Sequence, residues 1–326
     1  MTARLTCVFL TLLTASAMGA GERIYINDKK APENRKDIET IQNAMQKAMP
    51  QARAATVCVD MGNGSGTGVI VSADGLVLTA AHVAAGVKRK VTVVLEDGTR
   101  LDAKTLGLVS DKDAAMIQIT EKGSYPFVAI DRDNSTQLGD WVFALGHAGG
   151  FEKSRGPVVR LGRLVRIEGD TFQSDCILIG GDSGGPLFDL NGRVVGIHSR
   201  VGQQLQSNMH VPMAVFLANW DSMTKGEFIG EGPYAQKPEK GKGVLGLASE
   251  ARPEGGLIVT KVVDKSAAQE AGIVEGDILH KLNGKPLEKH EQILDLLKEM
   301  TVGEELTLEV EHAGKTETLT IPLGER

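Results

Sequence analysis

Short strand-like segments follow one another from Ala55 to Asn219, each broken from the next by glycine, aspartate or asparagine. Turn signals that recur about every 8 to 12 residues are typical of all-β sandwiches and barrels. The dipeptides Asp97-Gly98 and Asn191-Gly192 are of the kind found in tight hairpin turns. The strand-like segments are VCVDM, GTGVIVS, GLVLTA, KVTVVLEDG, AAMIQI, WVFALG, PVVRLGRLVRI, CILIG, PLFDLNGRVVGIHS and SNMHVPM. This pattern predicts a mainly β domain built as a sandwich or a pair of barrels.

The regions on either side of these segments have a different character. Between residues 33 and 49 the apolar residues recur at helical spacing, which predicts one amphipathic helix that Pro50 ends and that packs on the β domain. These apolar residues are Ile38, Ile41, Met45, Ala48 and Met49. Residues 221–242 lack periodicity and are rich in glycine, proline, glutamate and lysine, so we expect a linker there.

A second unit follows the linker, as a chain of 326 residues leads one to expect. GVLGLAS, GLIVTKVV and DILHKLNGKPL read as strands, SAAQEAG as a short helix, and the last residues as a hairpin around Ala313-Gly314. Residues 289–300 read as a helix with one apolar face. The sequence therefore predicts a small α+β domain over 243–324.

Charge and cysteine content narrow the class of protein. The formal net charge of −6 argues against a nucleic-acid-binding surface, which would need a basic face. Cys58 and Cys176 could form one disulfide bond, but two buried free thiols are the reading we favour because they match no disulfide framework. No CxxC, HExxH or EF-hand motif occurs, so we expect neither a metal nor a cofactor.

The first twenty residues resemble a secretory signal. Arg4 precedes the apolar run Leu5–Leu13, and small residues follow, with Ala17 and Gly19 best placed for cleavage. The run is too short to span a bilayer core of about 30 Å, although an uncleaved anchor remains an alternative. The sequence predicts export, to the periplasm or beyond.

Residues 180–188 read GGDSGGPLF, with Ser183 between two pairs of glycines. Glycine clusters usually mark tight turns, and this one could be no more than that. A catalytic serine would need a histidine to take its proton and a carboxylate to orient that histidine. His82 in LVLTAAHV and Asp113 in DKDAAMIQI are candidates, each placed next to an apolar strand. Taken singly, either could be a structural residue.

The three residues together are far more specific. They run in the order His82, Asp113, Ser183, with the first two in the first half of the β region and the serine in the second. G-x-S-x-G also describes the nucleophile elbow of α/β-hydrolases, but that motif needs a helix after the serine. Here Pro186-Leu187-Phe188 leads into a hairpin instead. We therefore interpret Ser183 as a nucleophile.

The order of the triad and the motifs GDSGGPL and TAAHV resemble those of the chymotrypsin-like double β-barrel proteases. With the signal, the preceding helix, the stretch GSGTGVIVS-x-DGLVLTAAHV and the C-terminal unit, the chain resembles the HtrA (Deg) family. In that family a trypsin-like domain is followed by one or two PDZ domains. The resemblance covers roughly 50–219 and 241–324 and implies a single PDZ domain here. The domains expected are a signal peptide at 1–20, a helical segment at 21–50, a protease domain at 51–220, a linker at 221–242 and a PDZ domain at 243–324.

The resemblance implies roles for named residues. His82 would be general base and then acid, Asp113 would hold its tautomer, and Ser183 would form the acyl-enzyme. The oxyanion hole would consist of the backbone N–H groups of Gly181 and Ser183, with that of Asp182 nearby.

A substrate pocket is expected beside the oxyanion hole. Its apolar lining predicts a small or medium aliphatic residue at the cleaved bond, with His198 as a wall rather than a second base. The expected pocket residues are Ile177, Leu178, Ile179, His198 and Ser199, with Arg200 beside them along the substrate strand.

The PDZ-like unit has a candidate peptide site of its own. Val244-Leu245-Gly246 resembles the carboxylate-binding loop, and a C-terminal peptide would add a strand beside Leu247. The alternative is that this domain only packs on the protease domain.

The chain departs from the HtrA pattern in two ways. Asp182 stands where the family usually has asparagine, and we expect a lysine, an arginine or water to satisfy it, because an unpaired buried carboxylate is costly. The stretches GDTFQSD and ALGHAGGFEKSRGP are short, which puts the family's activation by loop ordering in a trimer in doubt. Tyr25 and Ile26 offer an apolar contact for a homo-oligomer.

Two functions compete. The first is an exported, PDZ-regulated serine endopeptidase that cleaves unfolded or damaged proteins. The second is a chaperone or adaptor on a protease fold with weak or no proteolysis. The presence of all three triad residues favours the first.

Overall fold

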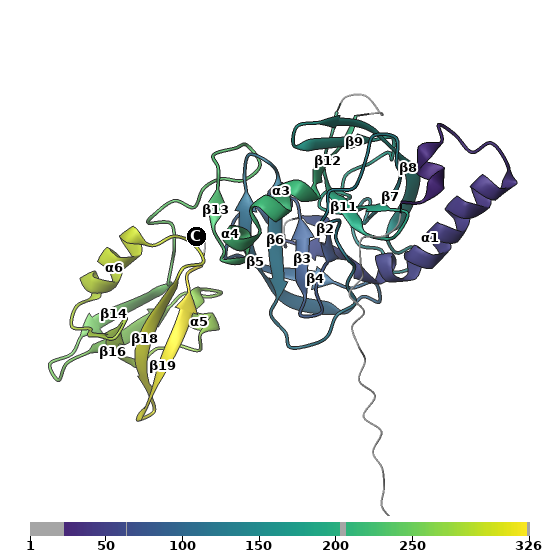
Figure 1. Cartoon of the computed structure of the whole chain (residues 1–326). Coiled ribbons are helices and arrows are strands. Elements are labelled where there is room, and N and C mark those ends of the chain that lie inside the picture. Colours follow the sequence, from purple (N-terminus) through teal and green to yellow (C-terminus); the bar gives the residue numbers. More distant parts are fainter. Residues whose placement is uncertain (1–22, 63, 203–206, 325–326) are drawn as a thin grey trace, which may run out of the picture.

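The computed structural model describes residues 23–62, 64–202 and 207–324. The signal predicted at 1–20 lies outside these ranges. No helix within the described ranges is both long and apolar enough to cross a membrane. Figure 1 shows the order of the parts: a leading helix, two β-barrels, and a smaller α+β unit at the C-terminal end.

The leading helix α1 (Arg35–Ala55) follows a 3₁₀ turn η1 (Tyr25–Asp28) and is capped by the Asn34 side chain, which accepts from the Asp37 N–H. The prediction that Pro50 ends this helix is wrong, since the helix continues for one more turn. Proline removes one helical hydrogen bond. The extra turn buries Ala52 and Ala55 completely, which offsets that loss.

The first barrel contains six strands. They are β1 (Thr56–Asp60), β2 (Ser65–Ile70), β3 (Leu76–Thr79), β4 (Lys90–Val94), β5 (Arg100–Val109) and β6 (Ala114–Ile119). They lie in the order β5-β4-β1-β2-β3-β6, and pairing of β5 with β6 closes the barrel. The sequence reading missed β5, although its buried Leu101 and Ala103 alternate with the exposed Asp102.

The second barrel is closed in the order β10-β11-β12-β9-β8-β7. Its strands are β7 (Trp141–Gly146), β8 (Val158–Glu168), β9 (Thr171–Ser174), β10 (Pro186–Asp189), β11 (Val194–Val201) and β12 (Asn208–Pro212). The prediction that CILIG is a strand is wrong. The Leu178 N–H donates to the Asn208 side chain and the Ile179 N–H to the Asp182 carboxylate, so side chains take the place of ladder partners.

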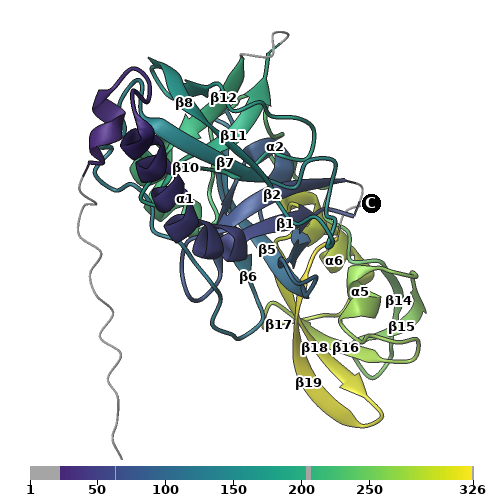
Figure 2. The same ribbon diagram turned by 90° about the vertical axis from the view of Figure 1, so that its right-hand side faces the viewer.

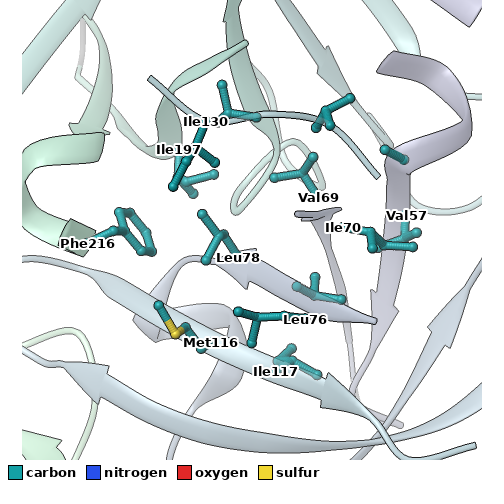
Figure 3. Packing of buried hydrophobic residues seen from close by; sticks show 14 of the residues in the cluster. Val57, Val69, Ile70, Leu76, Leu78, Met116, Ile117, Ile130, Ile197 and Phe216 are labelled. Carbon is teal, nitrogen blue, oxygen red and sulfur yellow. The ribbon is translucent and has the colours of Figure 1, made fainter. Parts of the chain in front are cut away.

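One hydrophobic core holds the two barrels together. Figure 3 shows Leu78 and Met116 of the first barrel near Ile197 of the second and Phe216 of α3 (Met213–Ala218). All four side chains are essentially inaccessible to water. The two barrels are therefore held in a fixed arrangement by a common, tightly packed core.

The segment expected to be a linker is partly ordered. It takes in most of α4 (Trp220–Thr224) and then β13 (Phe228–Ile229), which pairs in parallel with β5. Beyond it the Gly232 N–H donates 2.9 Å to the Ser110 hydroxyl. This stretch is thus attached to the first barrel rather than free of it.

The C-terminal unit has its own buried core. Its elements are β14 (Leu247–Ala251), β15 (Leu257–Val262), α5 (Ala267–Glu270), β16 (Ile278–Leu282), β17 (Lys285–Pro286), α6 (His290–Glu299), β18 (Glu305–His312) and β19 (Lys315–Pro322). It lies beside the first barrel (Figure 2), and the Lys104 ammonium is 2.9 Å from the Glu305 carboxylate across the boundary. The helix expected over 289–300 and the hairpin at Ala313-Gly314 are both present.

Candidate active site

His82 and Asp113 are held together on the first barrel. His82 lies in the short helix α2 (Ala81–Ala84) after β3, and Asp113 lies immediately before β6. The His82 Nδ1 is 2.9 Å from both carboxylate oxygens of Asp113, and the His82 backbone N–H donates to the same group at 3.0 Å. Asp113 has no exposed surface, whereas the His82 side chain is 36% exposed. The carboxylate therefore orients a ring that still faces solvent.

The Asp113 backbone takes a left-handed conformation, with φ of 59°. This region is uncommon for non-glycine residues, and such strain gathers at functional sites. The Ser199 hydroxyl on β11 of the second barrel donates to Asp113 Oδ2. Sequence reasoning placed Ser199 in the substrate pocket, but here it also joins the Asp113 carboxylate to the other barrel.

Ser183 lies on the turn that precedes β10, opposite the first barrel. The Thr67 N–H on β2 donates to the Ser183 carbonyl at 2.7 Å, and the Thr67 hydroxyl donates to the Gly181 carbonyl at 2.7 Å. A side chain at Gly184 would begin only 3.1 Å from the Ala80 nitrogen, two residues before His82. The turn that carries Ser183 thus packs directly against the segment that carries His82.

No hydrogen bond joins the His82 ring to the Ser183 hydroxyl within the described ranges. Catalytic hydrogen bonds are often long in proteins without substrate and tighten when the complex forms. The structure therefore brings together the segments that carry the three predicted residues and bonds two of these residues, His82 and Asp113, directly.

The backbone N–H groups of the turn fall into two kinds. The Asp182 N–H donates to the Ile179 carbonyl at 3.1 Å and is occupied. In the described part of the chain, the N–H groups of Gly181 and Ser183 donate to no backbone carbonyl. Gly181 has φ of 95°, and a Cβ there would lie 2.4 Å from the His147 carbonyl. Only glycine fits this position, which explains part of the glycine cluster.

Arg160 on β8 satisfies Asp182. Its guanidinium donates to Asp182 Oδ1 at 2.9 Å and lies 2.8 Å from Oδ2, in a two-pronged ion pair. The Ile179 N–H donates to the same carboxylate at 2.9 Å. Asp182 has no exposed surface. The expectation of a lysine, arginine or water is thus confirmed for arginine, and the ion pair fixes the conformation of the turn that carries Ser183.

A cavity of about 90 Å³ lies next to Ser183. Of the predicted pocket residues, Leu178, Ile179, His198 and Ser199 line it, whereas Ile177 does not. Arg200 and Val201 complete the wall.

His198 belongs to a buried network. Its Nε2 donates to the Leu145 carbonyl, and its Nδ1 is 3.0 Å from the His210 Nδ1. The His210 Nε2 accepts from the Ser174 hydroxyl. Burial, together with the nearby His210, lowers the pKa of His198 well below its usual value. The lowered pKa favours a neutral His198 that forms part of the pocket wall rather than a second catalytic base.

Cys58 and Cys176 are buried and free. Burial raises the pKa of Cys58 to about 11 and that of Cys176 to about 12, so both remain thiols at neutral pH. The reading as two free thiols is confirmed.

In the C-terminal unit the Val244 N–H pairs with the Gly324 carbonyl. The N–H groups of Leu245 and Gly246 donate to no backbone carbonyl in the described part of the chain, and Leu247 begins β14. Across from them, the Ser249 hydroxyl and the His290 ring are 2.8 Å apart and connect β14 to α6.

Two family matches correspond to these two parts of the chain. Residues 66–197 match the trypsin-like peptidase domain, and residues 238–323 match the PDZ domain. The chain therefore contains a trypsin-like peptidase domain followed by a PDZ domain.

Among the proteins similar to this chain is a probable periplasmic serine endoprotease, DegP-like, from Bartonella henselae, 31% identical over 79% of this chain and 52% of the relative. A protein of the same description from Ectopseudomonas mendocina is 32% identical over 79% and 56%. The chain thus spans about half the length of the curated relatives it matches. A solved serine endoprotease from Yersinia pestis aligns over 91% of this chain and 99% of its own, with 23% identity and a TM-score of 0.49.

Sequence reasoning missed three residues at the site. Thr67 lies in the quoted stretch GSGTGVIVS but carries no catalytic signal by itself. Arg160 lies 22 residues before Asp182 in the chain, and no local motif connects the two residues. Tyr234, whose ring centre is 6.5 Å from that of His82, lies in the segment expected to be a linker.

Proposed function

We propose that this chain is a serine endopeptidase in which His82, Asp113 and Ser183 act as a catalytic triad. The single observation that carries the proposal is the Asp113–His82 pair, which lies on the segment that packs against the turn carrying Ser183. With its Nδ1 bonded to Asp113, the ring has its Nε2 available to take the Ser183 proton. Ser183 would then attack a peptide carbonyl to form an acyl-enzyme, and the protonated His82 would give its proton to the leaving amine.

The tetrahedral intermediate needs donors for its oxyanion. The N–H groups of Gly181 and Ser183 are suited to this role because neither is committed to a backbone carbonyl among the described residues. The predicted contribution of Asp182 is dropped from the proposal, because its N–H already bonds Ile179. One such donor in related sites is worth ~2.7–4 kcal/mol of transition-state stabilisation.

Selectivity follows from the small cavity beside Ser183. Its volume of about 90 Å³ and its partly apolar wall suit a small or medium aliphatic side chain. A hydrophobic pocket distinguishes neighbouring side chains by only ~1–3 kcal/mol per methylene. We therefore propose loose specificity, which is appropriate for cleaving unfolded or damaged proteins.

The PDZ domain would bind the C-terminal carboxylate of a peptide at the N–H groups of Leu245 and Gly246. Val244, included in the predicted loop, would contribute shape rather than a donor, since its N–H is bonded to Gly324. The peptide would continue as a strand beside Leu247, between β14 and α6. It would have to displace the Ser249–His290 contact.

We further propose that the protein is exported. The relatives are described as periplasmic, and the sequence of residues 1–20 has the features of a secretory signal. Whether it acts as a monomer or as a homo-oligomer such as a trimer is a separate question from the chemistry of one cleft.

A fluorophosphonate probe tests the proposal. It should label the intact protein at Ser183 and leave the Ser183→Ala variant unlabelled. The intact protein should also degrade unfolded casein, and turnover should fall by about six orders of magnitude in the variant if the triad acts as a unit. Binding of unfolded casein by both proteins, with neither labelling nor cleavage, would instead identify a chaperone or adaptor.

A further inference from the structure

A second, much larger cavity lies beside His82. Its volume is about 680 Å³, and its walls come from three parts of the chain. They are the loop after α2 around Arg89, residues 233–239 and Lys242 of the expected linker, and Val302 of the PDZ domain. The triad chemistry proposed above makes no use of this space.

The linker wall is anchored to the first barrel. Besides the Gly232 bond, the Tyr234 N–H donates to the Ser110 carbonyl at 3.3 Å. A Cβ at Gly232 would lie 2.2 Å from the Asp111 Cα, so the chain approaches the barrel as closely as only glycine allows. The cavity is therefore bounded by a fixed segment.

Tyr234 and Arg200 connect the two cavities. The Arg200 guanidinium lies 5.8 Å from the centre of the Tyr234 ring, in a cation–π contact. Arg200 also lines the small cavity beside Ser183, while Tyr234 and His82 line the large one. A substrate with one side chain in the small cavity would pass Arg200 and present its preceding side chain to the large cavity.

The walls of the large cavity carry excess positive charge. Lys237 and Lys242 face a single carboxylate among the lining residues, that of Glu239. The Lys242 ammonium is 3.7 Å from Glu239, and Arg200 adds a further cation at the border. This local sign is opposite to that of the whole chain, whose formal net charge is −6.

We propose that the large cavity is a substrate subsite for an acidic side chain. The acidic residue would be the substrate residue immediately before the one whose carbonyl carbon is attacked. The linker thereby contributes directly to specificity, with Tyr234 packing on the bound backbone and the lysines attracting the carboxylate. The inference rests on the proposed peptidase function.

Two peptidyl phosphonates test the subsite. They carry the same aliphatic side chain at the reacting position and differ only in glutamate or glutamine at the preceding one. For the intact protein at low salt, we expect the glutamate reagent to inactivate about tenfold faster, with the preference shrinking as added salt screens the charges.

Matched variants locate the source of the preference. Lys237→Gln combined with Lys242→Gln should bring the two rates together. Lys240→Gln is the control, because Lys240 is in the same segment but pairs with Glu299 at 2.8 Å and does not line the cavity. Tyr234→Ala should slow both reagents, and Tyr234→Phe should restore them.

The outcomes separate this inference from the function beneath it. If the fluorophosphonate does not label the intact protein, the peptidase proposal fails first. If labelling occurs but the two phosphonates react equally, or neither reacts, the subsite is refuted. A glutamate preference that survives the double lysine change also overturns it.

Discussion

Asp113 and Asp182 are two buried aspartates on the two barrels that form the cleft, and neither has any exposed surface. Asp113 is paired with His82, a titratable ring that is 36% exposed toward the cleft. Asp182 is paired with Arg160, whose guanidinium keeps its charge at every physiological pH. The same residue type at the same burial therefore serves two purposes. The partner of Asp113 can exchange a proton, which suits the catalytic role proposed for this pair, whereas the partner of Asp182 suits a structural role.

The most stringent test of this comparison is a substitution at Asp113, where we expect the largest loss of activity. Asp113→Asn keeps the size of the side chain but removes the charge and favours the wrong tautomer of His82. We expect kcat to fall by ~10⁴, as in Ser-His-Asp triads generally, with little change in KM. Steady-state cleavage of a fluorogenic peptide measures this.

Thermal unfolding is the control for the Asp113 change, since the protein must still be folded when the activity is read. A loss of less than about tenfold would contradict a catalytic role for the carboxylate. It would place Asp113 in the same structural class as Asp182.

The residues proposed for catalysis could be located from the sequence, whereas the structural ion pair could be predicted only in part. His82, Asp113 and Ser183 carry local motifs, because a nucleophile needs a particular turn and a histidine needs small neighbours. That Asp182 must be satisfied by a lysine, an arginine or water followed from the cost of a buried unpaired charge. That the cation is Arg160 did not follow, because the strand β8 that carries it meets the nucleophile turn only once the barrel closes.

The same reasoning explains the other errors. CILIG is apolar enough for a strand, yet its backbone bonds to the side chains of Asn208 and Asp182. Residues 233–239 have the composition of a linker, and only the tertiary contact with Ser110 makes them a wall of the large cavity. Composition reports what a segment prefers alone, and these segments are determined by what they touch.

A smaller effect is expected at Arg160. Arg160→Met leaves Asp182 as an unpaired charge in the interior, which should lower the free energy of unfolding of the protease domain by ~3–5 kcal/mol. The turn that carries Gly181 and Ser183 should also become less ordered, so kcat should fall by a larger factor than KM rises. Urea unfolding and peptide cleavage measure the two effects.

Two further variants sharpen the interpretation. Arg160→Met with Asp182→Asn removes both charges and should recover much of the lost stability, whereas failure to recover would show that packing of the arginine, not its charge, matters. Arg166→Met on the same strand breaks an ion pair whose side chains are both more than 60% exposed. It should change the free energy of unfolding by less than ~1 kcal/mol.

The smallest effect concerns His147, a buried polar group of a third kind. Its ring has no exposed surface, and neither nitrogen has a hydrogen-bond partner within the described ranges. Burial lowers its pKa from 6.5 to about 4, although the nearby Thr56 backbone offsets part of that shift. In the unfolded chain the ring binds a proton near pH 6.5, so the folded state holds fewer protons between these values.

The stability contributed by a neutral His147 is therefore complete above pH 6.5 and is lost as the pH falls toward 4. We expect ~2–3 kcal/mol of the acid-induced loss to come from this residue. His198 and His210, whose pKa values burial also lowers, add to the same slope.

His147→Phe should reduce the loss between pH 6.5 and 4 without abolishing it, as measured by urea unfolding of the protease domain at several pH values. An identical slope in His147→Phe and the intact protein would mean that folding does not change the pKa of His147. The ring would then be tolerated in the interior without a hydrogen-bond partner and without a cost in stability.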